Sequence, residues 1–211
     1  MIRALRPAAF AALALSVATL AGAPALAAGV KVGAKAPEFT AVDSNGKTVR
    51  LADFRGKLVV LEWSNHDCPY VRKHYRAGNM QSQQDAAAKA GIVWLTIISS
   101  AEGEQGHVSG AKANALTAER KAKPAHVLFD PAGTIGRAYD AKVTPHMYVI
   151  GKDGTLLFQG GIDSIASTRD ADIERAKQYV REALAEIAAG KPVTDHTTRA
   201  YGCTIKYKPG A

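Results

Sequence analysis

One short stretch of the sequence combines a cysteine with several basic side chains. Cys68 directly precedes Pro69, and proline is favoured at the first position of a helix, so we expect Cys68 to be the N-cap residue of a helix. The N–H groups at a helix N-terminus carry a partial positive charge, and Arg72 and Lys73 lie one turn further along. These charges favour a thiolate, so Cys68 is predicted to be a partly exposed nucleophile. An inert buried thiol is the alternative.

A second cysteine, Cys203, lies near the C-terminus. Two cysteines in an oxidising compartment permit one disulfide, so Cys203 is the candidate within the chain to resolve a mixed disulfide on Cys68. The segment after Gly190 has no hydrophobic period and is predicted to be an extended tail. About 13 residues at ~3.3 Å each reach roughly 40 Å, enough to cross a domain of this size. A permanent structural disulfide and a bridge between chains are the alternatives.

The elements around these cysteines follow from apolar runs. Residues 58–63 (LVVLEW) predict a buried strand that ends at Trp63, which we expect in the core or beside the thiol pocket. The remaining predicted strands and helices alternate along the chain, and Asn45-Gly46 predicts a hairpin before them. The resulting expectation is an α/β fold with a central mixed sheet of about five strands, flanked by helices, with an N-terminal hairpin and an extended C-terminal tail.

The last predicted helix has the clearest period. A start signal lies at Ser167 and Asp170, and a stop signal lies at Gly190. Between them, apolar residues recur every three or four positions: Ile173, Ala176, Val180, Leu184 and Ile187. We therefore predict one continuous helix with one face on the sheet.

Composition and the N-terminus limit the class of protein. The chain has 211 residues, of which 47% are hydrophobic and 22% charged, which is typical of a globular protein. Residues 1–27 contain a basic start, an apolar run and the A-x-A site Ala25-Leu26-Ala27, which predict a secretory signal peptide. A retained signal anchor is the alternative. Cleavage would leave a periplasmic protein with a domain at 28–189 and a tail at 190–211.

The charge pattern argues against two classes of partner. The 27 basic residues outnumber the 19 acidic ones, but they are spread along the chain without a nucleic-acid-binding motif, so we expect no nucleic-acid partner. No second apolar run approaches the roughly 18 to 20 residues of a membrane span, so no stable span is expected after signal cleavage.

Several motifs together resemble a known family. The stretches 32–39 (VGAKAPEF) and 151–163 (GKDGTLLFQGGID), the strand followed by Cys68-Pro69, and Val143-Thr144-Pro145 resemble the thioredoxin superfamily, more narrowly its redoxin or peroxiredoxin-like (AhpC/TSA-type) branch. The resemblance covers residues 32–189. It implies a thioredoxin-like fold, with Pro145 as the family's cis-proline against the reactive cysteine and Thr144 as the residue whose backbone pairs with an incoming peptide or thiol.

The sequence also departs from the family pattern. Val71 stands where dithiol oxidoreductases have a second cysteine, so no local disulfide can form. Peroxiredoxins usually have Thr or Ser where Asn65 stands, and an Arg where Pro145 stands. Arg72 and Arg199 are the candidates to replace that arginine. Efficient peroxidase chemistry is therefore not the first expectation.

Three histidines extend the candidate site. We expect His66 and His74 to tune the thiol or to act as acid and base for the leaving thiolate. His146 adjoins the expected cis-proline, so three imidazoles and the thiolate of Cys68 could converge. Such a set suits Cu(I) or Zn²⁺, and copper-delivering proteins with this fold use similar sets. Cys68, His66, His74 and His146 are therefore candidate metal ligands, as an alternative to a site without a metal or other cofactor.

The expected function is that of a periplasmic thioredoxin-like oxidoreductase. Cys68 attacks a disulfide or oxidised sulfur on a protein partner, Thr144 and Pro145 align it, Cys203 resolves the adduct, and an external thiol reductant restores the dithiol. The first alternative is an antioxidant thiol peroxidase that reduces peroxides through a sulfenic acid. The second is a non-catalytic thioredoxin-fold binding protein or a Cys/His copper-binding protein. The oligomeric state stays open.

Overall fold

The computed structural model describes residue 1 and residues 29–209, so the expected cleavage site lies outside the described residues. The strands are β1 (Thr40–Asp43), β2 (Thr48–Arg50), β3 (Val59–Trp63), β4 (Val93–Ile98), β5 (His126–Phe129), β6 (Val143–Thr144), β7 (His146–Ile150), β8 (Leu156–Gly160) and β9 (Cys203–Thr204). The helices are the 3-10 helix η1 (Leu51–Phe54), α1 (Pro69–Arg76), α2 (Asn79–Lys89), α3 (Gly110–Glu119), α4 (Thr134–Ala138), α5 (Asp172–Arg175) and α6 (Tyr179–Ala188). None of the helices in residues 29–209 combines the length and the apolar character that crossing a membrane requires.

The main sheet is mixed and has seven strands in the order β2-β1-β5-β4-β3-β7-β8. Strand β3 pairs in parallel with β4 and antiparallel with β7, which confirms the predicted mixed sheet. The expected number of about five strands was too small, because the N-terminal hairpin joins the sheet. Its strand β1 pairs with β5, with Val42 opposite Phe129, so the exposed edge of β5 is covered.

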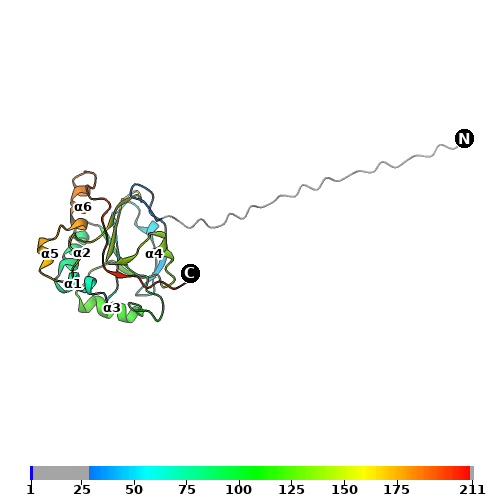
Figure 1. Ribbon diagram of the computed structural model, residues 1–211. Helices are drawn as coiled ribbons and strands as arrows, with labels where there is room; N and C mark the ends of the chain where they lie inside the picture. The colour runs from blue at the N-terminus through cyan, green and yellow to red at the C-terminus, as the bar shows by residue number, and fades with distance from the viewer. Residues whose placement is uncertain (2–28, 210–211) are drawn as a thin grey trace.

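Side chains of β3 alternate between two cores, as expected for a strand. Leu61 and Trp63 point into one core, which α4 covers, and Val60 points into the other, which α1, α2 and α6 cover. Figure 1 shows α1, α2 and α6 on one side of the sheet and α4 on the other. Helices therefore flank both faces, as predicted, and Cys68 belongs to the core beneath α1.

The cysteine begins helix α1 as the sequence predicts. Cys68 is its N-cap residue with extended backbone (φ −68°, ψ 121°), and Pro69 is the first helical residue. The helix ends before Gly78, whose φ of 73° suits glycine, and α2 starts immediately after it. Gly78 therefore separates α1 from α2.

The last predicted helix is interrupted, so the expectation of one continuous helix was wrong. Ala176 has extended backbone (φ −83°, ψ 140°) and ends α5, and α6 begins at Tyr179. Lys177 instead pairs with Ser164: its carbonyl accepts from the Ser164 N–H at 3.1 Å, and its own N–H donates to Ser164 Oγ at 3.0 Å. These long-range hydrogen bonds outweigh the local apolar period.

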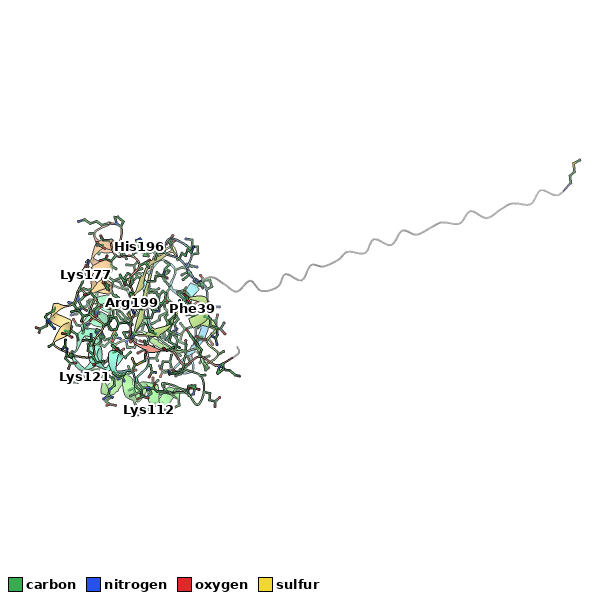
Figure 2. The ribbon with its side chains drawn as sticks, viewed as in Figure 1. Phe39, Lys112, Lys121, Lys177, His196 and Arg199 are labelled. Atoms are coloured by element: carbon green, nitrogen blue, oxygen red, sulfur yellow. The ribbon has the colours of Figure 1, made fainter. Side chains whose placement is uncertain are left out.

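The C-terminal tail lies over the domain in an extended form. It begins after α6, and its Asp195 forms an ion pair at 2.5 Å with Lys177, which precedes α6; Figure 2 labels Lys177 and His196. The tail then pairs with Gln159 of β8, forms β9 against β6, and inserts Ile205 into the core that α4 covers. The part of the tail up to residue 209 is thus an integral layer of the fold.

Candidate functional site

The loop before Cys68 is held by Asn65. The Asn65 carbonyl accepts the N–H of Cys68 at 3.1 Å, and its side-chain oxygen accepts the N–H of Asp67 at 2.9 Å. Its amide nitrogen donates to the carbonyl of Gln105 at 3.3 Å. Asn65 is buried. The residue at the position of the peroxiredoxin Thr or Ser therefore shapes the turn that places Cys68 at the start of α1.

The sulfur of Cys68 faces the loop that contains Pro145. Cys68 Sγ donates a hydrogen bond of 3.1 Å to the carbonyl oxygen of Thr144. The peptide bond between Thr144 and Pro145 is cis, so the proline assignment from the family resemblance is confirmed. Thr144 and Pro145 thus lie against Cys68, as the resemblance implied.

Cys203 lies next to the same loop. In the antiparallel pair of β6 and β9, Cys203 is directly opposite Thr144, and the Thr144 hydroxyl donates to the Cys203 carbonyl at 3.5 Å. The two cysteines are both thiols, and Cys203 packs against the core that contains Cys68. Burial, the hydrogen bond with Cys68 and the charge of Cys68 raise the pKa of Cys203 to about 12. The structure therefore brings the two cysteines together, although the sequence separates them widely.

The expected partial exposure of Cys68 was wrong. Cys68 has 0% of its surface exposed and packs in the core with Val71 and Met147. Tyr201 and Cys203 of the tail pack against the same core. The sequence could not show this burial, because the residues that cover the sulfur come from a segment without a hydrophobic period.

The basic residues of α1 do not share one role. Lys73 is fully buried, and its ammonium lies 3.3 Å from the carboxylate of Asp163, which is also buried. Asp163 compensates the charge that desolvation would otherwise penalise. Arg72 is exposed, and so is Arg199 of the tail, whereas the sulfur of Cys68 is buried. Figure 2 labels Arg199 on the tail. Neither arginine takes the place of a peroxide-polarising arginine at the sulfur.

The histidines lie in separate environments. Burial lowers the pKa of His74 to about 3 and that of His146 to about 4, and it also lowers the pKa of His66. His74 contacts Asn79, whereas His146 packs on the ring of Tyr148. All three are therefore neutral at pH 7.

The candidate metal ligands do not converge. Between residues 29 and 209 no group of three or more His, Cys, Asp or Glu side chains is placed to hold a metal ion. Cys68, His66, His74 and His146 all fall within that range, so they do not form one coordination site.

Trp63 lies on the face of the sheet opposite to Cys68. Its ring packs against Tyr139 and Tyr148, with centroid separations of 5.4 and 5.0 Å, and its indole N–H donates to Ser99 Oγ at 3.0 Å. The expectation of core packing is confirmed. A place beside the thiol pocket was wrong, because side chains of β3 alternate and Trp63 points into the core that α4 covers.

Sequence reasoning missed three polar residues near the site, of which Glu62 and Asp163 are buried and Tyr201 is half-buried. Glu62, on β3, accepts hydrogen bonds from Trp94 at 2.9 Å and from Tyr75 at 3.0 Å, and burial raises its pKa. Asp163 and Tyr201 form a hydrogen-bonded pair between the β8–α5 loop and the tail. Glu62 could have been noticed as the single charge in the run LVVLEW, but nothing in the sequence links Asp163 to Tyr201.

The chain matches a family model over most of its domain. Residues 32–159 match the AhpC/TSA family, which is more than half of the chain. The chain belongs to the AhpC/TSA family. No curated protein matches it. The family and the fold together place it in the redoxin branch of the thioredoxin superfamily.

Solved structures support the same fold. An uncharacterized conserved protein from Geobacillus kaustophilus has a TM-score of 0.73 and 23% identity, and the match covers 86% of this chain and 94% of that one. A hypothetical protein from Sinorhizobium meliloti 1021 has a TM-score of 0.72 and 21% identity, covering 87% and 98%. The thioredoxin domain of a thiol-disulfide oxidoreductase from Bacteroides vulgatus has a TM-score of 0.51 and 18% identity, covering 69% and 97%. The chain therefore has a thioredoxin-like fold.

Proposed function

We propose that this AhpC/TSA-family chain is a thiol-dependent oxidoreductase that carries two electrons on the Cys68 and Cys203 pair. The observation that carries the proposal is that both cysteines lie at Thr144, beside the cis Pro145: Cys68 Sγ donates to the Thr144 carbonyl, and Cys203 is paired with Thr144 and packs against the core that holds Cys68. Cys68 is the N-cap residue of α1 and lies beside the cis Pro145, whereas Cys203, with its raised pKa, holds its proton at neutral pH. Cys68 is therefore the attacking sulfur.

In the first step the Cys68 thiolate attacks one sulfur of a partner disulfide. A bond forms between the two sulfurs, the partner's S–S bond breaks, and the released partner thiolate takes a proton from solvent. The product is a mixed disulfide on Cys68. This step removes the negative charge of the Cys68 thiolate.

In the second step Cys203 resolves the adduct. Two of the three causes that raise the pKa of Cys203 come from Cys68, namely its hydrogen bond and its charge. Both disappear in the mixed disulfide, so Cys203 loses its proton more easily. Its thiolate attacks Cys68 Sγ, a Cys68–Cys203 disulfide forms, and the second partner thiol leaves. The partner has gained two electrons, and an external dithiol reductant returns two electrons to the chain.

Two variants test this order of attack in a dithiol-driven assay with a model protein disulfide. Cys68→Ser removes the attacking sulfur, so turnover is expected to fall to the uncatalysed rate. Cys203→Ser leaves the first step intact, so a mixed disulfide between Cys68 and the partner is expected on a non-reducing gel when the reduced variant meets the disulfide without added dithiol. Turnover by Cys68→Ser, or a mixed disulfide on Cys203 instead, would overturn the proposal.

A second candidate function is the reduction of small peroxides. The complete burial of Cys68 and the pairing of Thr144 with the tail favour a small oxidant over a folded protein. The Cys68 thiolate would attack one peroxide oxygen, forming a sulfenic acid and releasing an alcohol or water. Condensation with Cys203 would then give the disulfide and water.

One equivalent of hydrogen peroxide at neutral pH separates the two candidates. A peroxidase loses both thiols within seconds, whereas a thiol-exchange protein keeps them far longer and loses them quickly to a disulfide substrate. Stopped alkylation and mass analysis at intervals measure both rates. Cys203→Ser is the matched control, because it shows whether a sulfenic acid persists on Cys68 when the resolving thiol is absent.

We also propose that residues 1–27 are a signal peptide that sends residues 28–211 to the periplasm. The support is the basic start, the apolar run and the A-x-A site. N-terminal sequencing of the protein recovered from the periplasm of an expressing bacterium should begin at Ala28. Recovery only from the cytoplasm with Met1 intact would contradict it.

A further inference from the structure

A buried polar cluster joins the tail to helix α1 next to the two cysteines. The hydroxyl of Tyr201 donates to Asp163, and it accepts from Lys73 Nζ at 3.3 Å. Lys73 also contacts the Asp163 carboxylate at 3.3 Å and the Ile165 carbonyl at 3.4 Å. Lys73 and Asp163 have 0% of their side chains exposed. Burying charged groups this completely is unfavourable unless hydrogen bonds and ion pairs replace the lost water. The hydroxyl of Tyr201 supplies one such hydrogen bond to Lys73 and one to Asp163.

His74 gives Tyr201 a further partner. Its Nε2 lies 3.3 Å from the Tyr201 hydroxyl, and its Nδ1 lies 2.9 Å from the amide nitrogen of Asn79. With a pKa of about 3, His74 is neutral at pH 7 and has one ring proton. Since Asn79 donates to Nδ1, the proton is on Nε2 and points to Tyr201. The hydroxyl of Tyr201 therefore accepts two hydrogen bonds and donates one.

The ring of Tyr201 is also held in place. It packs edge-on against the ring of Tyr70 with a centroid separation of 5.6 Å, and Lys73 Nζ lies 5.5 Å from its centroid. Only Gly202 separates Tyr201 from Cys203. Gly202 has a φ of 140°, and a Cβ on it would collide with the carbonyl oxygen of Thr144. The backbone between Tyr201 and Cys203 is therefore tightly constrained, so the position of the Tyr201 ring determines the position of the Cys203 thiol.

We propose that Tyr201 is a positioning residue for Cys203, and that its anchoring in the Lys73–Asp163–His74 cluster raises the effective concentration of the Cys203 thiol at Cys68. This inference rests on the proposed function, because it assigns to the tail the control of how readily Cys68 and Cys203 form their disulfide. Lys73 then has a role other than charge stabilisation at the sulfur: it holds the tail that carries the resolving thiol.

The test is the equilibrium of the reduced chain with oxidised glutathione. One oxidised glutathione and the two thiols give the Cys68–Cys203 disulfide and two reduced glutathiones, which balances both atoms and electrons. Tyr201→Phe keeps the ring and removes the hydroxyl. Because hydrogen bonds to charged groups are lost, the equilibrium constant is expected to fall on the order of tenfold. That fall equals an upward shift of about 30 mV in the reduction potential.

Tyr139→Phe is the matched control. Tyr139 belongs to the core that α4 covers, not to the core of Cys68, and its hydroxyl donates to the Pro37 carbonyl at 2.7 Å. Tyr139→Phe is expected to have the same equilibrium constant with oxidised glutathione as the wild type. A purely structural role of Tyr201 would lower the free energy of unfolding of both redox forms equally and leave the constant unchanged, and that result would overturn the inference. Tyr70→Ala removes the ring packing on Tyr201 and leaves the buried charges in place. It should lower the equilibrium constant for disulfide formation as well. This variant provides the test if Tyr201→Phe does not fold.

Failure of this inference and failure of the proposed function give different results. A wild-type chain that forms no Cys68–Cys203 disulfide at any glutathione ratio overturns both. A wild-type chain that forms it, together with unchanged constants in Tyr201→Phe and Tyr70→Ala, overturns only the positioning role.

Discussion

The two cysteines of the site differ in their surroundings at the level of single atoms. Cys68 Sγ donates to the Thr144 carbonyl at the start of α1, whereas Cys203 is close to the Cys68 sulfur and partly buried. A thiolate on Cys68 disfavours a second negative charge on Cys203. The two thiols are therefore suited to lose their protons one after the other. Cys203 loses its proton after Cys68 has reacted.

This electrostatic order predicts the titration of Cys203 in Cys68→Ser. The hydroxyl carries no charge, so the pKa of Cys203 should fall from about 12 toward its ordinary value while burial keeps it somewhat raised. A lower pKa means more thiolate at a given pH, so alkylation of Cys203 at pH 9 should be faster than in the wild type. The pH profile of alkylation measures this. An identical profile in both proteins would contradict the assigned coupling.

Glu62 predicts a pH dependence of stability. Burial raises its pKa in the folded chain, so above the ordinary value the unfolded chain ionises first and the free energy of unfolding falls. The loss is about 1.4 kcal/mol for each pH unit between the ordinary and the folded pKa. Urea unfolding at pH 4 and pH 7 measures it. The free energy of unfolding of Glu62→Gln should depend less on pH over this window, and an equal slope in both proteins would argue against a raised pKa of Glu62.

At the scale of the elements, β9 occupies the edge of β6 beside the cysteine. Thr144 pairs with Cys203, and the Ile205 N–H donates to the Lys142 carbonyl at 3.0 Å. The backbone that the family resemblance assigns to an incoming peptide is thus used by the chain's own tail. A protein partner must exchange with β9 or react where the tail opens.

Gly202→Ala tests whether β9 controls access to Cys68. A Cβ there collides with the Thr144 carbonyl, so the tail should open more often. Strain at such a position costs about 1–3 kcal/mol, so alkylation of buried Cys68 should accelerate on the order of tenfold. Gly190→Ala is the control, since Gly190 also has positive φ, 69°, but no atom lies within 4 Å of its Cβ position. Equal rates in the two variants would contradict the gating by β9.

Local signals explain which elements could be predicted from the sequence. Some features depend only on neighbouring residues and can therefore be predicted from the sequence: strand β3, the N-cap Cys68 followed by Pro69, and the glycine at 78 between α1 and α2. The interruption at Ala176 depends on hydrogen bonds to Ser164, and the burial of Lys73 depends on Asp163. Those contacts join segments far apart in the sequence, so a local pattern of apolar residues cannot predict them.

At the scale of the whole molecule, the C-terminal tail packs back onto the domain. It runs from the end of α6, across β8 and β6, to the core that α4 covers, so the C-terminal segment touches both sides of the sheet. Cys68 and Cys203 are 135 positions apart (203 − 68), and a disulfide between them would tie the start of α1 to this last layer. Oxidation would then restrict most of the unfolded chain.

The oxidised chain should therefore be more stable than the reduced chain. A disulfide that closes a long loop typically stabilises a protein by about 2–4 kcal/mol. The urea midpoint of the oxidised wild type should exceed that of the reduced wild type accordingly. Cys203→Ser cannot form the bond and should show the same midpoint with and without reductant. A wild-type midpoint that does not respond to reductant would argue against a disulfide within the chain.

The most direct test of the central claim is peptide mapping of the wild type after treatment with one equivalent of a disulfide oxidant. We predict a monomeric product in which one linked peptide pair contains Cys68 and Cys203, and in which neither thiol reacts with an alkylating reagent until reductant is added. Two thiols that remain fully alkylatable, or a bond that joins two chains, would contradict the account.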